Sequence, residues 1–242
     1  MTYRGVRMNE SVFHNIKSNP TVIQGFPGFG LIGSIVTEFM IEHLKCAKLD
    51  QHYFEELPAN LAIHDGKIIE PISVFYNEHY NILIIHSLIS GNGIEWKAAD
   101  YVDEICSKVN ARELVSIEGA SSGGESQGRT FYHCTDATRI EYLKSKGAQE
   151  LKEGIIMGVT SALLLKSKVP MLCLFGEAES SMPDNNAAAS IIEMLDKIFD
   201  LQIDPQPLRE SAKALEEKFK GIMQQMQSAG EEKDKKIMSY VG

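Results

Sequence analysis

The sequence predicts an α/β protein, a sandwich with a mixed, mostly parallel sheet, followed by a C-terminal helix and a mobile tail. Short apolar runs alternate with helical patterns along most of the chain, and this alternation favours a parallel sheet covered by helices. Residues 61–87 instead have the pattern of two successive hairpins, which add antiparallel strands. Two prolines near residue 205 end the alternation, so we expect a body over 1–204 and a helix and tail over 205–242.

Apolar periodicity and turn residues predict the elements of the first half. A continuous apolar run closed by proline and glycine predicts a buried strand at 21–26, and apolar residues at helical spacing predict a helix at 31–45. The two hairpins turn at Asp65-Gly66 and at Asn77-Glu78-His79, since such residues favour tight turns. An amphipathic pattern then predicts a second helix at 94–109.

The second half continues the alternation. We expect strands at 112–120 and 169–178, the latter central in the sheet because it is continuously apolar. Between them, residues 153–168 predict a nearly all-apolar helix that is buried on several sides. A last helix of the body is expected at 184–199, with Asp184 as its N-cap.

Composition excludes several classes of function. The chain has 242 residues, 43% of them hydrophobic, and a net charge of -9, so it lacks the basic patch that grips nucleic acid. Its longest apolar runs are too short to span a bilayer, and the N-terminus lacks the apolar core of a signal peptide. The scattered cysteines have no zinc or redox spacing and fit reduced core positions in a cytoplasmic protein: Cys46, Cys106, Cys134 and Cys173.

A glycine motif lies between the first strand and the first helix. Gly28, Gly30 and Gly33 spell G-x-G-x-x-G, the context of a dinucleotide-binding loop, and Asp50 lies where an acidic residue would bind the ribose. However, the next segment is hairpin-like, and bulky apolar residues flank the glycines. A tight strand-to-helix turn needs the same glycines. The motif alone leaves two hypotheses, a structural turn or a nucleotide- or phosphate-binding, ligase-like enzyme.

A second motif has the pattern of a hydrolase. Gly119, Ser121 and Gly123 form G-x-S-x-G after a strand, with His86 and His133 elsewhere in the chain. The residues that follow do not begin a helix, as a nucleophile elbow requires. We therefore expect a surface loop rich in small residues and no catalytic residue.

Metal binding is not expected either. Glu177, Glu179 and Asp184 follow a strand and could hold magnesium with phosphates, but a solvated loop and a helix cap explain them better. The seven histidines have no ligand spacing. The sequence predicts no metal site and no cofactor.

Several stretches, in order, resemble the proteasome assembly chaperone family in its archaeal form. They are "GFPGFGLIG" at 25–33, "SGNGIEWKAADYVDEI" at 90–105, "IEGASSGG" at 117–124 and the segments 153–168 and 169–195. The resemblance covers roughly residues 20–200. It implies a three-layer α/β/α body, a homo-oligomer, for which we expect a tetramer, and a non-enzymatic role in assembling or activating the proteasome core particle. It also implies that the glycines shape a structural turn.

A seam of apolar residues follows the body. Its members are spaced by 4, 3, 4, 3 and 4 positions, which is the spacing of a narrow coiled-coil-like stripe: Leu208, Ala212, Leu215, Phe219, Ile222 and Met226. The spacing leaves open whether this stripe packs on its own body or on a partner subunit.

The chain ends in a charged run with an apolar tip. Proteasome activators and some assembly chaperones of this class end in hydrophobic-Tyr-any residue, which docks between neighbouring α-ring subunits. Here Tyr240 is third from the end and follows Ser239, so the match is loose. We nevertheless expect the tip to bind proteasome α subunits, through Ile237, Met238, Tyr240, Val241 and Gly242.

Overall fold

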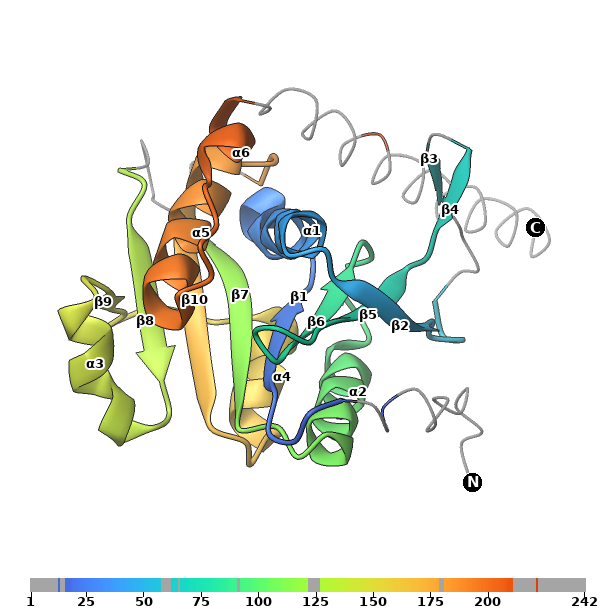
Figure 1. Cartoon of the computed structure of the whole chain (residues 1–242), viewed down its shortest axis with the longest axis horizontal. Coiled ribbons are helices and arrows are strands. Elements are labelled where there is room, and N and C mark those ends of the chain that lie inside the picture. Colours follow the sequence, from blue (N-terminus) through green and yellow to red (C-terminus); the bar gives the residue numbers. More distant parts are fainter. Residues whose placement is uncertain are drawn as a thin grey trace, which may run out of the picture.

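In the computed structural model, the described residues are 13, 16–57, 62–64, 66–90, 92–121, 127–178, 181–210 and 221. Most of their strands join one mixed sheet, covered by helices on both faces (Figure 1). In spatial order the sheet contains β2 (Ala47–His52), β5 (Ile72–Asn77), β6 (Ile82–Ser87), β1 (Thr21–Gly25), β7 (Glu113–Ser121), β10 (Met171–Ala178), β8 (Thr130–Cys134) and β9 (Gln149–Glu150). The predicted three-layer α/β/α fold is confirmed.

The middle of the sheet is parallel and apolar. β6, β1, β7 and β10 run side by side in one direction, with Ile23 of β1 opposite Ile84 on one side and Val115 on the other. Every residue of β6 and β10 is buried, as expected for strands covered on both faces. Antiparallel pairing of β2 with β5, β5 with β6 and β8 with β10 makes the sheet mixed.

The helices form two outer layers. α1 (Ile32–His43), α5 (Asn185–Phe199) and α6 (Gln206–Glu210) pack together over one face, and α2 (Glu95–Lys108) and α4 (Gly158–Lys166) pack together over the other (Figure 1). α3 (Ile140–Ser145) lies beside the β8–β9 edge, and two short 3₁₀ turns, η2 (Phe29–Leu31) and η3 (Ala137–Arg139), precede α1 and α3. The predicted cap is confirmed, because Asp184 Oδ1 accepts a hydrogen bond of 2.9 Å from the Ala187 N–H.

Both predicted hairpins are present. β5 and β6 form the second hairpin, whose turn is closed by a 2.9 Å hydrogen bond from the Tyr80 N–H to Asn77 Oδ1. The first, β3 (Ala62–His64) with β4 (Lys67–Ile69), is a separate two-stranded sheet that projects from the body (Figure 1). Its cross-strand pair Ile63 and Ile68 is largely exposed.

The predicted helix over 153–168 is shorter than expected. Met157 is extended (φ -122°, ψ 176°) and Gly158 has φ +72°, so the helix begins only at Gly158 and ends at Lys166. The expectation of burial on several sides is wrong for this stretch, since Ile155 is 90% exposed and Leu165 is 73% exposed. Residues 151–157 instead form an irregular, apolar surface segment.

The cysteines are free thiols within the body. Cys106 and Cys173 are buried, whereas Cys46 and Cys134 are half-buried. Burial raises the pKa of both Cys106 and Cys173 to about 12, so neither thiol is a nucleophile near neutral pH.

The start of the C-terminal segment lies on the body. Leu208 of α6 is fully buried, and Arg209 Nη2 lies 2.6 Å from Glu193 Oε1 of α5. The rest of the apolar seam, from Ala212 to Met226, lies outside the described residues. The division of the chain at residue 204 therefore stays a prediction.

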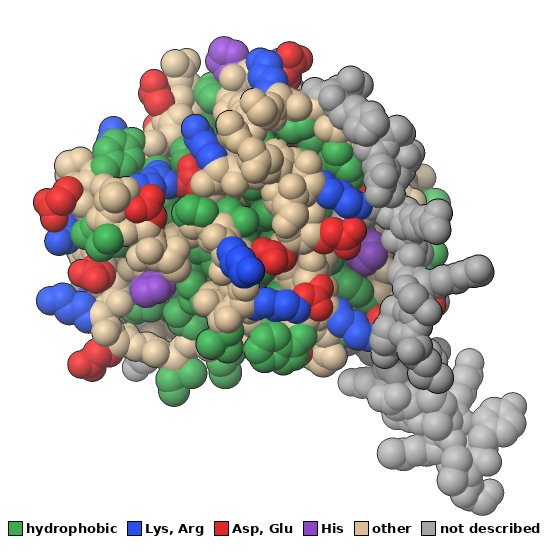
Figure 2. Space-filling model, turned by 90° about the horizontal axis from the view of Figure 1, so that it is seen from below, with side chains coloured by type: hydrophobic (Ala, Val, Ile, Leu, Met, Phe, Trp, Pro, Cys, Tyr) green, Lys and Arg blue, Asp and Glu red, His purple; other side chains and the backbone are tan. Residues whose placement is uncertain are grey.

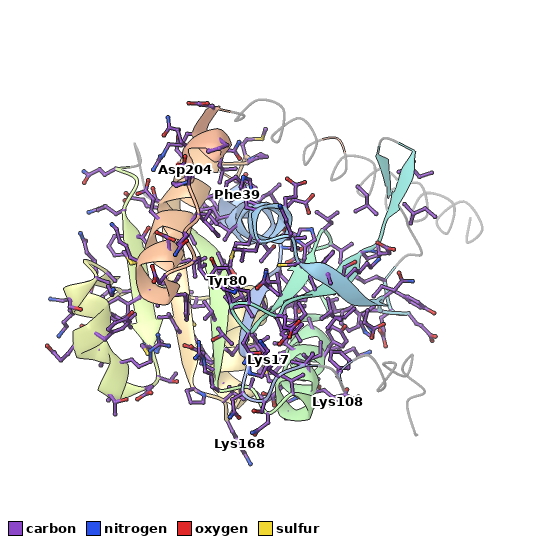
Figure 3. The ribbon with its side chains drawn as sticks, in the orientation of Figure 1. Lys17, Phe39, Tyr80, Lys108, Lys168 and Asp204 are labelled. Carbon is purple, nitrogen blue, oxygen red and sulfur yellow. The ribbon has the colours of Figure 1, made fainter. Side chains whose placement is uncertain are left out.

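Charges of both signs mix at the amino ends of the parallel strands (Figure 2). Lys17, Lys108 and Lys168 lie at this end of the molecule (Figure 3), and the first two pair with Glu78 and Glu104 at 3.6 and 3.0 Å. Within the described part of the chain, no helix has the length and apolar character that crossing a membrane requires.

Candidate functional site

The glycine loop connects β1 to α1 through two left-handed residues. Gly30 has φ +67° and ψ 8°, and Leu31 has φ +51° and ψ 21°, immediately before α1 begins. The Leu31 N–H donates to the Gly28 carbonyl at 3.1 Å, which closes a tight turn. Only glycine adopts such a φ without strain, so position 30 needs a glycine for its backbone alone.

The other two glycines allow close packing. A Cβ on Gly28 would lie 1.7 Å from Glu118 Oε1 of β7. A Cβ on Gly33 would lie 2.7 Å from the Phe26 carbonyl oxygen and 2.9 Å from that of Ile117, so the first turn of α1 sits directly on β1 and β7. Each glycine of the motif therefore has a structural reason that involves no ligand.

Glu118 lies beneath this loop and ends a polar chain through the core. Gln24 donates to Ser116, the Ser116 and Thr160 hydroxyls lie 2.8 Å apart, and Thr160 Oγ1 donates to Glu118 Oε2 at 3.1 Å. Burial raises the pKa of Glu118 to about 7, although hydrogen bonds from Thr160 and from the Gly119 backbone oppose this shift. No sequence motif points to Glu118, because a single glutamate near a strand end carries no recognisable spacing.

A cleft of about 1130 Å³ opens at the carboxyl ends of β1, β7 and β10. The glycine loop and Glu118 line one side, aromatic rings such as Phe29 and Phe131 line the interior, and the irregular segment 151–157 forms the rim. Parallel strands end here on either side of β1, where α/β proteins usually bind ligands.

The cleft also contains one internally satisfied ion pair. The buried carboxylate of Glu177 accepts from Arg129 Nη2 at 2.5 Å and Nε at 3.2 Å, and from the Gln127 N–H at 2.9 Å. The Arg129 hydrogen bond holds the pKa of Glu177 below its usual range. Glu177 is thus committed to Arg129, Asp184 caps α5, and Glu179 lies outside the described residues.

The structure does not bring metal ligands together in the part that it describes. Among those residues, no three His, Cys, Asp or Glu side chains converge as a bound ion would need. The absence of a metal and of a cofactor stays a prediction.

Asp50 cannot serve a nucleotide at the glycine loop. It lies in the edge strand β2, which β5 and β6 separate from β1. Adjacent strands are about 4.8 Å apart, so the carboxylate is three strand spacings away. The Glu118 carboxyl group against Gly28 would also repel a phosphate in its ionised form.

The hydrolase candidates lie apart. Ser121 is the last residue of β7 and pairs with Ala178, with no helix directly after it in the described residues 127–134. His86 is on β6, where its Nδ1 lies 2.8 Å from Thr37 Oγ1 and its Nε2 lies 3.2 Å from Glu38 Oε2. His133 on β8 pairs with Cys173 of β10. Ser121 pairs with Ala178, which lies five residues further along β10. These residues do not form a triad.

The partner-binding residues expected at the C-terminus, Ile237, Met238, Tyr240, Val241 and Gly242, lie outside the described residues. Their role stays a prediction.

The geometry thus defines an α/β/α protein in which the glycines of the motif serve a tight turn and close packing. The model of the PAC2 family matches residues 22–223, and because this is most of the chain, the protein belongs to the PAC2 family. The resemblance inferred from the sequence is confirmed at this level.

Individual relatives share the fold over most of their length. Pyrococcus furiosus PbaA, described as an archaeal homolog of proteasome-assembly chaperone, is 26% identical, with a TM-score of 0.78 over 88% of this chain and 95% of its own. PbaB of the same organism, described as an archaeal proteasome activator, is 24% identical, with a TM-score of 0.70 over 85% and 94%. An uncharacterised Methanocaldococcus jannaschii protein is 27% identical over 86% of this chain and 87% of its own.

Proposed function

We propose that this protein is a proteasome assembly chaperone or core-particle-binding protein that docks on α subunits through its C-terminal tail, without catalysis. The observation that carries the proposal is the similarity to PbaA, which spans 88% of this chain and 95% of that protein, together with the match of residues 22–223 to the PAC2 family. The family relationship supports the general role, and the composition of the tail supports the docking site.

The tail has the chemistry of a weak anchor. Residues 231–236 carry three acidic and three basic side chains, so their net charge is zero and bulk charge steering is not the source of affinity. Ile237, Met238 and Tyr240 offer apolar area that a pocket on the partner can cover. One buried tyrosine contributes roughly 1.5–3 kcal/mol, which is useful only when an oligomer presents several tails together.

The enzymatic alternative has weaker physical support. A ligase-like activity at Gly28–Gly33 would need a phosphate to approach a loop whose glycines already contact Glu118 and two backbone carbonyls. The expected ribose-binding residue, Asp50, is in a distant edge strand. A protein that acts by binding alone needs neither feature.

Binding to surface-immobilised α subunits tests the proposal. We expect deletion of residues 237–242 to remove most of the affinity and Tyr240→Ala to weaken binding by at least about tenfold, in line with the loss of one buried aromatic side chain. Tyr53→Ala, which removes a half-exposed tyrosine from the body, is the matched control and should bind as the wild type does. If the deletion and Tyr240→Ala bind as tightly as the wild type, the contact surface lies on the body or on the segment 208–226.

A further inference from the structure

The docking proposed above does not use the cleft at the carboxyl ends of β1, β7 and β10. Its volume of about 1130 Å³ slightly exceeds the range of about 300–1000 Å³ that is usual for small-molecule sites. The question is which ligand its walls would recognise.

The charged lining is acidic. Arg129 and Glu177 neutralise each other, and the remaining charged residues of the lining, among those that the structure describes, are Glu118, Glu150 and Glu153 against Lys152. Glu118 is the innermost of these, held between Gly28 of the loop and Thr160 of α4, whereas Glu150, Lys152 and Glu153 are exposed at the rim. The electrostatic preference of the cleft is therefore for a cation that reaches inward.

Exposed apolar side chains lie beside the charged ones at the rim. Ile155 is 90% exposed and Met157 is 75% exposed, both in the irregular segment 151–157. Phe29 and Phe131 continue this apolar surface into the cleft. Adjacent apolar side chains at this level of exposure are typical of surfaces that another polypeptide covers.

We propose that the cleft binds an extended segment of a partner polypeptide in which a lysine is flanked by apolar side chains. The lysine ammonium lies beside Glu118, and the flanking side chains cover Phe29, Phe131 and the rim at Ile155 and Met157. This inference goes beyond the proposed function and does not depend on the tail.

The carboxylate geometry favours lysine over arginine. Thr160 already donates to Oε2 of Glu118, and the Gly119 backbone N–H also donates to this carboxylate. A bidentate guanidinium needs both oxygens, whereas a compact ammonium with a long methylene stem can approach one. The methylene stem can lie along the aromatic rings on its way inward.

Proton release provides a second signature. Glu118 is mostly protonated below about pH 7, and an ammonium beside it favours the ionised form. Binding should then release more protons at pH 6.5 than at pH 8, as linkage requires. A lysine-containing segment should therefore bind more tightly at pH 8 than at pH 6.5.

Isothermal titration calorimetry on the full-length protein tests the proposal without any proteasome subunit. The probes are acetylated, amidated pentapeptides Gly-Z-Lys-Z-Gly, where Z is Leu, Ile, Met or Phe, and the same peptides with norleucine in place of lysine. Norleucine keeps the methylene stem and lacks the ammonium. At pH 8 we expect lysine peptides to bind at least about tenfold more tightly than their norleucine counterparts, the ratio of one charge-assisted hydrogen bond.

Two isosteric variants locate the effect. Glu118→Gln should reduce the preference for lysine to less than about twofold and abolish proton release at pH 6.5, whereas Glu153→Gln at the exposed rim should preserve both. If both variants lose the preference for lysine equally, the overall negative charge of the cleft and not Glu118 attracts the peptide. That result would overturn the proposal. Glu118→Ala, which also removes the charge, replaces Glu118→Gln if the latter does not fold.

The wild type alone is also decisive. Equal affinity for lysine and norleucine peptides, no binding of any peptide at millimolar concentration, or no proton release at pH 6.5 would each contradict the proposal. Because the assay contains no α subunits, its outcome is independent of whether the tail docks on the proteasome.

Discussion

At the scale of single residues, Glu118 links the fold to pH. Its pKa is about 7 in the folded protein, against an ordinary value of 4.5. Between these two pH values the folded protein therefore holds a proton that the unfolded chain has lost. The stability associated with this proton is complete below about pH 4.5 and is lost as the pH rises through about 7.

The expected consequence is a pH-dependent gain in the variant Glu118→Gln. At pH 5 we expect its free energy of unfolding to lie close to that of the wild type. At pH 8 we expect it to exceed the wild type by up to about 3 kcal/mol, since each pH unit is worth about 1.4 kcal/mol. Urea unfolding at both pH values measures the difference. Glu153→Gln, at an exposed position, should show no such change, and a Glu118→Gln curve parallel to the wild type would disprove the assigned pKa.

At the scale of elements, the glycine loop makes a prediction about packing. Gly30→Ala should lower the free energy of unfolding by about 1 kcal/mol because of its positive φ. Gly28→Ala should cost at least as much because of Glu118, and Gly33→Ala more, since two backbone carbonyls cannot move aside. At Gly147, φ is +83° and an added Cβ would meet no atom within 4 Å. Gly147→Ala therefore measures the cost of the positive φ alone.

The same variants test the nucleotide hypothesis. Melting of the wild type is measured with and without ATP, ADP and NAD, because a ligand of the native state raises the melting temperature. We expect no shift with any of them. A clear shift that Gly28→Ala abolishes would restore the enzymatic alternative.

Elements with strong patterns could be predicted from the sequence, and those without them could not. β10 begins with five apolar residues in a row, and α5 has a capping aspartate, so the bounds of each element were predicted within about two residues. β2 reads "AKLDQH" and lies at the edge of the sheet with a bulge between Lys48 and Asp50, so it has neither apolar run nor alternation. The short α3 and two-residue β9 offer too few positions for any period to emerge.

The candidate site was predictable only in part, for a similar reason. The glycines could be recognised because a tight turn constrains positions that are neighbours in the sequence. The cleft depends on Glu118, Arg129 and Ile155, which come from separate parts of the chain and meet only through the crossover connections of the sheet. The exposure of Ile155 followed from the extended Met157 and the left-handed Gly158, whereas the apolar composition of 153–168 had favoured one continuous helix.

At the scale of the whole molecule, the surface retains exposed apolar side chains that a lone subunit would not favour. Ile63 and Ile68 form a pair on the projecting β3–β4 hairpin and are 62% and 59% exposed, and Trp96 at the start of α2 is 56% exposed. A two-stranded hairpin is marginally stable by itself in water. A neighbouring subunit that covers such groups would stabilise both the hairpin and the assembly.

We therefore expect a homo-oligomer, with light scattering at micromolar concentration giving at least twice the chain mass of 26.9 kDa and four times that mass for a tetramer. Oligomerisation matters to the proposed function because a single tail binds too weakly, whereas linked tails gain from their effective concentration. Deleting residues 237–242 should leave the mass unchanged while removing α-subunit binding, which separates assembly from docking. A monomer that still binds α subunits tightly would contradict the multivalent mechanism, because one tail would then have to supply the whole affinity.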